Sequence, residues 1–556
     1  MSSSPPAPPR APLDRAIVLH EAGDLAQAAA IYQDLLREEP GHAEALHLLG
    51  VAHQQSGRDG LAVRLIRQAI AVHPSDARFY SHLAVSLRRL GRLAEAVHML
   101  QRVLAFTPRF APALNNLGNA LQAQGRVAEA MGCFGTAAAH DPGFAAAHDN
   151  FIYSRLFLPE TTPQAALADH RCWSQVHAAA IAAAAPRPPL RQTPPRRIGL
   201  VSADFRRHQV AYYVVRVVEA LAAMGIAVTC YASQSQQMED STSARFRAVA
   251  DWRAVAGLDD GALAELVRAD GIDVLIDLSG HFAGHRLLTF ARRPAPLQLT
   301  WAGYPGTTGM DVFDGIIGDP HEIPAGAEGD YSEPVLRMPG CWICYDPPAD
   351  APAVAAPPWA RRGHVTLGSL NTPPKLGPAV AATWAEILAG RPSARLLLGY
   401  RGLDDGSTGE RIAAMIRAHG IARERIELRG EADSHAAFLA YYHDIDLALD
   451  PFPFSGSVTT CEALWMGAPV LTWPGPTFAG RHSLSILANV GLDDLVAGDR
   501  ADYVARALAL AGDPARLAGL RAGLRARVAA SPLVDGRRFA ADLMDLIERA
   551  WRGREG

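Results

Sequence analysis

The sequence of 556 residues predicts an α-helical repeat array followed by two α/β domains with parallel sheets. Two observations predict this fold class. Near the start of the chain, Pro, Gly and Ala recur together with a period of 34 residues. Behind that repeat, short apolar segments alternate with longer helical patterns to the end of the chain.

The repeat has one proline, one glycine and one alanine in each unit. The positions are Pro40, Pro74, Pro108 and Pro142; Gly23, Gly57, Gly91 and Gly125; and Ala28, Ala62, Ala96 and Ala130. This period is typical of tetratricopeptide repeats. In such a unit Pro ends the second helix, Gly turns the chain, and Ala lets the paired helices approach closely. We expect three full units behind a partial one over residues 10–158, stacked as a superhelix that binds peptide or protein.

Two asparagines of the segment NNLGNAL are candidates for peptide binding. Asn115 and Asn116 can hydrogen-bond an extended peptide backbone if they lie on the concave face; the alternative is ordinary polarity of an exposed helix. Residues 1–9 are rich in Ser and Pro and lack the apolar stretch of a secretory signal, so we expect a disordered lead. Residues 159–194 predict a helical linker that ends in Pro and Arg.

The strand-like segments form two series. The first, in residues 195–345, contains RIGLVSADF, IAVTCYAS, DVLIDLSG, LQLTWAGYP and FDGIIGDP. A Pro/Ala-rich linker at 346–363 separates it from the second, in residues 364–533, with VTLGSLN, ARLLLGYR, RIELRG, DLALDP and APVLTWP. Two Rossmann-like domains of this kind leave a crevice at the carboxyl ends of their strands, where ligands bind. This is the architecture of a GT-B glycosyltransferase, although periodicity alone also allows an epimerase or a periplasmic-binding-type sandwich. A last helix in 534–556 is expected to pack back on the first domain.

The composition excludes several classes of partner. A net charge of −4 gives no basic footprint for nucleic acid. No apolar run reaches the roughly 18 residues of a membrane span. Six cysteines in so long a chain fit reduced thiols and a cytoplasmic location. The CWIC segment at 341–344 has no second Cys or His pair at zinc spacing, so we expect no metal there.

The chain contains a single lysine, Lys375 in SLNTPPKLGPAV, and its other cations are arginines. Lysine is a compact point charge on a flexible stem and meets a phosphate end-on, whereas arginine is a planar fork. The exception therefore marks Lys375 as a candidate phosphate ligand, with a stray surface lysine as the alternative.

A second candidate lies in DPFPFSGSVTTCEALWMGAPVLTWPG, residues 450–475. A strand, a Ser/Gly turn and a helix leave free amides at the helix start, which we place at Ser457, Val458, Thr459 and Thr460. Such a helix start is suited to a diphosphate; plain helix capping is the alternative. Glu462, further into that helix, can accept ribose hydroxyls. The DID segment at 444–446 opens a buried strand, so we do not expect it to bind a metal.

Together with the repeats, the segments VSADFRRH, DLSGH, FARRPAPLQLTWAGYPGTTG, LNTPPKLGP and TTCEALWMGAPV resemble the O-GlcNAc transferase and SPINDLY group, glycosyltransferase family 41. The resemblance implies inverting, metal-independent transfer of a sugar from a nucleotide donor to Ser or Thr, with no cofactor. It also implies that Asn371, Thr372 and Lys375 contact the donor, with Lys375 essential at the diphosphate.

The same resemblance assigns four more residues. His208 would lie near sugar and acceptor, His281 would point into the same crevice, His435 would stack on the base, and Arg481 would belong to the nucleotide-side loop. Three departures leave base and sugar open: Pro373 and Pro374 before the lysine, Ser457-Val458-Thr459 at the phosphate turn, and Phe438 where animal members have Arg. UDP-GlcNAc is the default donor, with GDP-fucose or a flagellin-modifying sugar as alternatives. Two other readings are a binding scaffold with an inactive catalytic half and a small-molecule or lipid glycosyltransferase.

Overall fold

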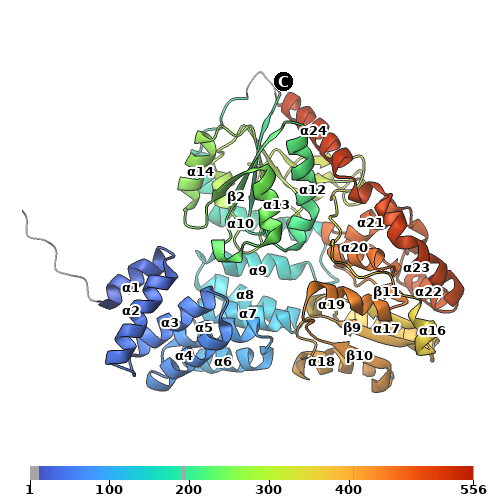
Figure 1. Ribbon diagram of the computed structural model, residues 1–556, viewed down its shortest axis with the longest axis horizontal. Helices are drawn as coiled ribbons and strands as arrows, with labels where there is room; N and C mark the ends of the chain where they lie inside the picture. The colour runs from blue at the N-terminus through green and yellow to red at the C-terminus, as the bar shows by residue number, and fades with distance from the viewer. Residues whose placement is uncertain (1–11, 191–193, 405, 555–556) are drawn as a thin grey trace, which may run out of the picture. The chain divides into compact units, whose positions relative to one another are not determined.

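The computed structural model describes residues 12–190, 194–404 and 406–554 (Figure 1). The chain divides into two compact units: one ends at Leu121 and also takes in Gly132–Asp141, and the other comprises Gln122–Met131 and the chain from Pro142. The predicted disordered lead, residues 1–9, lies outside the described residues. Among the described helices, none combines the length and apolar character needed to cross a membrane.

The repeat region consists of antiparallel helix pairs, as the 34-residue period predicts. Its helices are α1 (Pro12–Glu21), α2 (Leu25–Glu38), α3 (Ala43–Gln55), α4 (Asp59–Val72), α5 (Ala77–Arg89), α6 (Leu93–Phe106), α7 (Ala111–Ala123) and α8 (Val127–His140). The four repeat glycines have φ between +72° and +82°, and the four repeat alanines are fully buried. As predicted, the glycines turn the chain and the alanines lie where the paired helices approach closely. The front unit is a helix pair whose first helix has 10 residues, against 13 in α3.

Three helices follow the repeats within the second unit. They are α9 (Ala145–Arg155), α10 (Pro163–His177) and α11 (Ala179–Ala184). Thr162 caps α10, since its side chain accepts from the amide of Ala165, and Pro163 is its first residue. Trp173 of α10 is fully buried and packs with Ile152 of α9 against the first α/β lobe. Helix α9 is therefore held in the same unit as the α/β lobes.

The first α/β lobe contains a seven-stranded parallel sheet of order β3-β2-β1-β4-β5-β6-β7 within the described residues. Its strands are β1 (Arg197–Ser202), β2 (Ala227–Ala232), β3 (Asp251–Ala254), β4 (Val274–Asp277), β5 (Leu297–Thr300), β6 (Gly315–Gly318) and β7 (Val335–Arg337). The helices between them are α12 (Gln209–Ala223), α13 (Ser241–Val249), α14 (Asp260–Ala269) and α15 (Leu287–Ala291). The five predicted strands are present. The two outermost strands, β3 and β7, have no buried residues and therefore no apolar run to predict them.

The second lobe contains a five-stranded parallel sheet of order β10-β9-β8-β11-β12 within the described residues. Its strands are β8 (Thr366–Ser369), β9 (Arg395–Gly399), β10 (Ile426–Arg429), β11 (Leu447–Leu449) and β12 (Val470–Leu471). Its helices are α16 (Pro358–Arg362), α17 (Pro378–Gly390), α18 (Gly406–Arg417), α19 (His435–Leu439), α20 (Val458–Trp465), α21 (His482–Val490), α22 (Arg500–Ala511) and α23 (Pro514–Ala529). All five strands predicted from the second series are present.

The strand orders fix where a ligand can bind. In the first sheet the order reverses between β1 and β4, and in the second between β8 and β11. In open parallel sheets, ligands bind beyond the carboxyl ends of the strands at such a switch point. The candidate site is therefore expected where β1 and β8 end.

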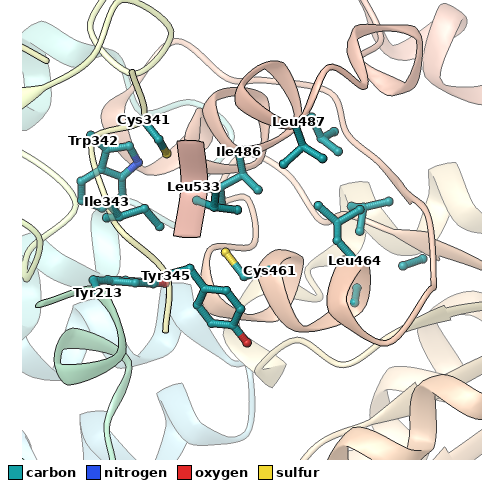
Figure 2. Close-up of a cluster of buried hydrophobic side chains, with 14 of the residues drawn as sticks. Tyr213, Cys341, Trp342, Ile343, Tyr345, Cys461, Leu464, Ile486, Leu487 and Leu533 are labelled. Atoms are coloured by element: carbon teal, nitrogen blue, oxygen red, sulfur yellow. The ribbon is translucent and has the colours of Figure 1, made fainter. Parts of the chain in front are cut away.

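The two lobes share one hydrophobic core. Figure 2 shows side chains of both lobes around Cys461 of α20 and Ile486 of α21, namely Tyr213 of α12, Cys341, Trp342, Ile343, Tyr345 and Leu533. The cysteines of the CWIC segment are free and buried in this core. The last helix, α24 (Gly536–Gly553), packs along α12 (Figure 1), and its Phe539 stacks on Trp301 with 5.5 Å between ring centroids. This shared core holds the ends of β1 and β8 in a fixed relation.

Candidate active site

A cavity of about 730 Å³ lies between the two lobes. His208, at the start of α12, follows β1, and Asn371 and Lys375 follow β8, so both switch-point strands lead into it. The residues predicted from the sequence that line this cavity are His208, Asn371, Thr372, Lys375, His435, Ser457, Val458, Thr459 and Glu462. Segments far apart in the chain are thus brought to one site.

Lys375 ends a short 3-10 turn directly behind β8. Its Nζ donates to the carbonyl oxygen of Ser455 at 2.6 Å and lies 4.3 Å from the ring centroid of Phe454. Burial lowers the pKa of Lys375 to about 8, against an opposing effect of Asp450. An ammonium group has three N–H donors, so two remain for a ligand in the cavity.

The start of α20 provides backbone donors beside this lysine. The amides of Val458 and Thr459 have no protein acceptor among the described residues. Thr460 differs from the prediction, because its amide donates to the carbonyl of Ser457 at 3.0 Å and its hydroxyl bonds Ser483 at 2.7 Å. The amide of Thr460 is therefore not available to a ligand, and the predicted diphosphate-binding turn is limited to Ser457–Thr459. The hydroxyl of Thr459 donates to Asn371 Oδ1 at 3.2 Å and links α20 to the end of β8.

At another part of the cavity, His435 and Glu462 form a hydrogen-bonded pair. His435 Nε2 lies 2.7 Å from Glu462 Oε1, and this bond raises the pKa of His435 despite its burial. The ring of Tyr212, from α12 of the first lobe, is parallel to His435 within 9° at 5.9 Å between centroids. Phe438 lines the same region. Flat rings beside a carboxylate are suited to a base and its ribose hydroxyls.

We expect Glu462→Gln to lower the pKa of His435, because the neutral amide removes both the charge and the charge-assisted hydrogen bond. Titration of the His435 imidazole by NMR measures this shift. Glu431→Gln is the matched control: this carboxylate lines the same cavity but forms no hydrogen bond or ion pair with His435 among the described residues. An unchanged His435 titration in Glu462→Gln would contradict the pairing.

His208 is the N-cap residue of α12 and faces the cavity. Its Nδ1 lies 3.4 Å from the amide of Val210 and 3.6 Å from Asp204 Oδ2. Burial lowers the pKa of His208, although Asp204 opposes it. A neutral imidazole at the end of β1 can orient a hydroxyl group or accept its proton.

The expectation that His281 points into the crevice is wrong. Its side chain is fully buried, with Nδ1 at 2.9 Å from Asp149 of α9 and Nε2 at 2.9 Å from the carbonyl of Thr308. Both ring nitrogens are used within the protein. Asp149 also bonds His285 Nε2 at 3.1 Å. His281 therefore joins α9 to the loop after β4.

Arg481 does not line the cavity either. Its Nε donates to the carbonyl of His321 in the first lobe at 2.6 Å, so it bridges the lobes. In the repeat unit, Asn115 is 7% exposed, and Asn116 Nδ2 donates to the carbonyl of Ser81 in the preceding repeat at 3.4 Å. Asn115 is therefore buried and Asn116 is half-buried, and their binding of a peptide stays a prediction. The sequence pattern could not distinguish these uses from ligand contacts.

The DID segment has a structural use. Asp444 pairs with Arg361 and Arg429, while Asp446 accepts from the amides of Trp359 and Thr366. Among the described residues, no group of three or more His, Cys, Asp or Glu side chains is placed to hold a metal ion.

The structure adds cavity residues that the sequence analysis missed. Tyr153 of α9 lines the cavity, and its ring contacts Phe454 at 6.2 Å and Phe282 at 4.9 Å between centroids. Phe157, four residues further along, stacks on Phe454 at 4.8 Å. Asp149 and Tyr153 of α9, and Phe157 two residues beyond its end, recur every four residues, so the same side of this segment contacts both lobes. That spacing in HDNFIYSRLFL was the available signal.

Comparison with known proteins finds a matching family for the repeat region and another for the two α/β lobes. The model of Glycosyl transferase family 41 matches residues 173–348 and 364–543, and a tetratricopeptide repeat model matches residues 19–85 and 87–149. The chain is similar to a protein of Solanum lycopersicum named probable UDP-N-acetylglucosamine–peptide N-acetylglucosaminyltransferase SPINDLY, with 34% identity over 363 residues. That match covers 64% of this chain and 39% of the relative, so the chain spans about two fifths of the relative's length.

Among solved structures, the chain resembles a mutant of Thermobaculum terrenum O-GlcNAc transferase. The two are 35% identical with a TM-score of 0.79, and the match covers 98% of this chain and 97% of that chain. A UDP-N-acetylglucosamine–peptide N-acetylglucosaminyltransferase of Caenorhabditis elegans is 23% identical over 477 residues, which cover 64% of this chain and 41% of that protein. Since the family model matches more than half of the chain, the protein belongs to glycosyltransferase family 41.

Proposed function

We propose that the protein transfers a sugar from a nucleotide donor to Ser or Thr of other proteins, with GlcNAc from UDP-GlcNAc as the default. One observation carries the proposal: a single cavity is lined both by Lys375 beside the start of α20 and by the hydrogen-bonded pair of His435 and Glu462. The names of the tomato and nematode relatives support the choice of UDP-GlcNAc and of a peptide acceptor.

The proposed reaction inverts the anomeric carbon. The acceptor hydroxyl oxygen forms a bond to that carbon on the face opposite the diphosphate, and the bond from carbon to phosphate oxygen breaks. The electron pair stays with the diphosphate, where Lys375 and the amides of Val458 and Thr459 stabilise it. The hydroxyl proton passes to His208, or it passes to an oxygen of the donor phosphate while His208 orients the hydroxyl. Because these groups provide the positive charge at the leaving diphosphate, the proposed reaction uses no metal.

The proposal assigns recruitment of acceptors to the tetratricopeptide repeats, since such arrays form extended concave binding surfaces. An array of this kind favours a protein acceptor over a lipid or a small molecule.

The test is to titrate the purified protein with UDP, GDP and CMP by calorimetry, and then to incubate it with the matching sugars and measure nucleotide release. We expect UDP to bind most tightly and UDP-GlcNAc to be consumed. A preference for GDP and GDP-fucose would replace the default donor. No binding of any nucleotide, with peptides still bound by the repeats, would overturn the enzymatic proposal in favour of a scaffold.

A further inference from the structure

We propose that His482 is a further catalytic residue: its Nε2–H donates a hydrogen bond to the departing diphosphate, and Glu322 is the positioning residue that fixes its tautomer. This inference rests on the proposed function, because it assigns a ligand to the same cavity.

His482 lies at the diphosphate end of the cavity. It begins α21 and lines the cavity, and its ring stacks on Trp342 with 5.1 Å between centroids. It also meets Phe454 edge-on at 6.1 Å, and Phe454 is the ring on which the ammonium of Lys375 lies. His482 therefore reaches the same part of the cavity as Lys375.

Ser483, the residue after His482, is hydrogen-bonded to the turn at the start of α20. Ser483 Oγ bonds the carbonyl of Gly456 at 3.1 Å and the hydroxyl of Thr460 at 2.7 Å. Both partners flank the start of α20. The imidazole of His482 is thus held beside the amides that we assign to the diphosphate.

Glu322 reaches His482 from the first lobe, in the segment that follows β6. The residue is fully buried, its Oε1 lies 2.7 Å from His482 Nδ1, and its Oε2 has no partner among the described residues. Burial and the neighbouring Asp319 raise the pKa of Glu322 well above its usual range, although Arg481 opposes this. Burial and Lys375 lower the pKa of His482 to about 3. The raised pKa of Glu322 and the lowered pKa of His482 both favour the uncharged forms of the pair, a carboxylic acid and a neutral imidazole.

The unpaired Oε2 decides between the two possible arrangements of protons. If Oε1 carries the acid proton, it donates to Nδ1, and Oε2 remains an under-satisfied acceptor. If Oε2 carries the proton, a buried O–H donor has no acceptor. Orphaned buried donors are rarer than under-satisfied acceptors, so the first arrangement is favoured. Nδ1 then accepts, and Nε2 carries the ring proton.

This tautomer gives the cavity a neutral donor. No protein acceptor for Nε2 is present among the described residues, and the ring lines the cavity. As the bond from sugar to diphosphate breaks, the electron pair moves onto a phosphate oxygen that can accept from Nε2–H. The hydrogen bond places no second positive charge beside Lys375.

The test measures UDP affinity by calorimetry and donor kcat/KM in His482 and Glu322 variants. His482→Phe keeps the stacking on Trp342 but removes the donor, and we expect both quantities to worsen about 10- to 100-fold. Glu322→Ala should show a similar loss, whereas Glu322→Gln should recover most of it, because an amide N–H can donate to Nδ1 as the acid does. His443→Phe is the matched control, since the side chain of His443 bonds the carbonyl of Ala353 and does not line the cavity.

A measurement on the unmodified protein keeps the inference testable if a variant fails to fold. The ¹⁵N shifts of His482 near neutral pH should show Nε2 protonated and Nδ1 unprotonated; a proton on Nδ1 would overturn the inference. UDP binding by the unmodified protein with equal binding by folded His482→Phe would also overturn it, while leaving the proposed function intact. Absence of nucleotide binding by the unmodified protein would instead overturn the proposed function and this inference together.

Discussion

Lys375→Met is expected to lower sugar transfer by a factor of about 10²–10³, because it removes a preorganised cation from the leaving diphosphate. Methionine keeps an unbranched side chain in contact with Phe454, so the fold should be retained. Nucleotide release from the donor, measured beside thermal unfolding of both proteins, separates lost chemistry from lost structure. Transfer at the unmodified rate by folded Lys375→Met would remove the central assignment of the site.

The pKa of Lys375 also predicts how kcat/KM depends on pH. The pKa of Lys375 is lowered to about 8 in the free protein, so the ammonium is present below pH 8 and is lost as pH rises through that value. Since kcat/KM reports ionisations of the free enzyme, we expect it to fall about tenfold per pH unit above about pH 8. Lys375→Arg should be slower at every pH and should not show this fall, because guanidinium stays charged.

Asp149→Asn is expected to lower the free energy of unfolding by about 3–5 kcal/mol, since it removes the buried carboxylate that bonds both His281 and His285. Burial alone would raise the pKa of Asp149, but His285 and His281 outweigh it and lower the pKa to about 2. Asp149 in turn raises the pKa of His285 against its burial. Denaturant unfolding of both proteins measures the difference.

The directions of these pKa shifts predict the pH range in which the two proteins differ most in stability. The contribution of Asp149 to the free energy of unfolding is present above its unfolded pKa of 3.8 and is lost as pH falls toward about 2. The contribution of His285 is present below 6.5 and is lost as pH rises through its raised pKa. The difference between the proteins should thus be largest from about pH 4 to 6.5. Glu548→Gln breaks an exposed pair with Arg552 and should cost less than about 1 kcal/mol; an equal effect of both substitutions would contradict the buried pair.

Much of the fold follows from periodicity. Recurring Gly and Ala positions predicted the helix pairs, and buried apolar runs predicted ten strands. The strands β3 and β7 were missed because an edge strand with half-exposed charged residues leaves no apolar run. Sequence patterns report burial on both faces of a strand far better than they report membership of a sheet.

The site was predictable where a residue type is exceptional or a motif is specific. Lys375 was identified because it is the single lysine of the sequence, and it lines the cavity. His281 was misplaced because the sequence does not say which way a side chain turns after a strand ends. Glu322 and His482 were missed because their pairing joins residues 160 positions apart and depends on packing between two lobes.

The contacts that α9 and the residues after it make with the two lobes limit where the repeats can be cut from the catalytic part of the chain. Asp149, Tyr153 and Phe157 precede the boundary at residue 158 that the repeat pattern suggests, yet they belong to the unit that holds the cavity. A protein shortened to begin after that boundary would lose a wall of its active site and leave His285 without its carboxylate. Transplanting a foreign repeat array onto this enzyme therefore requires a junction that keeps α9 and also Gln122–Met131, which belong to the same unit, so that the catalytic part stays whole.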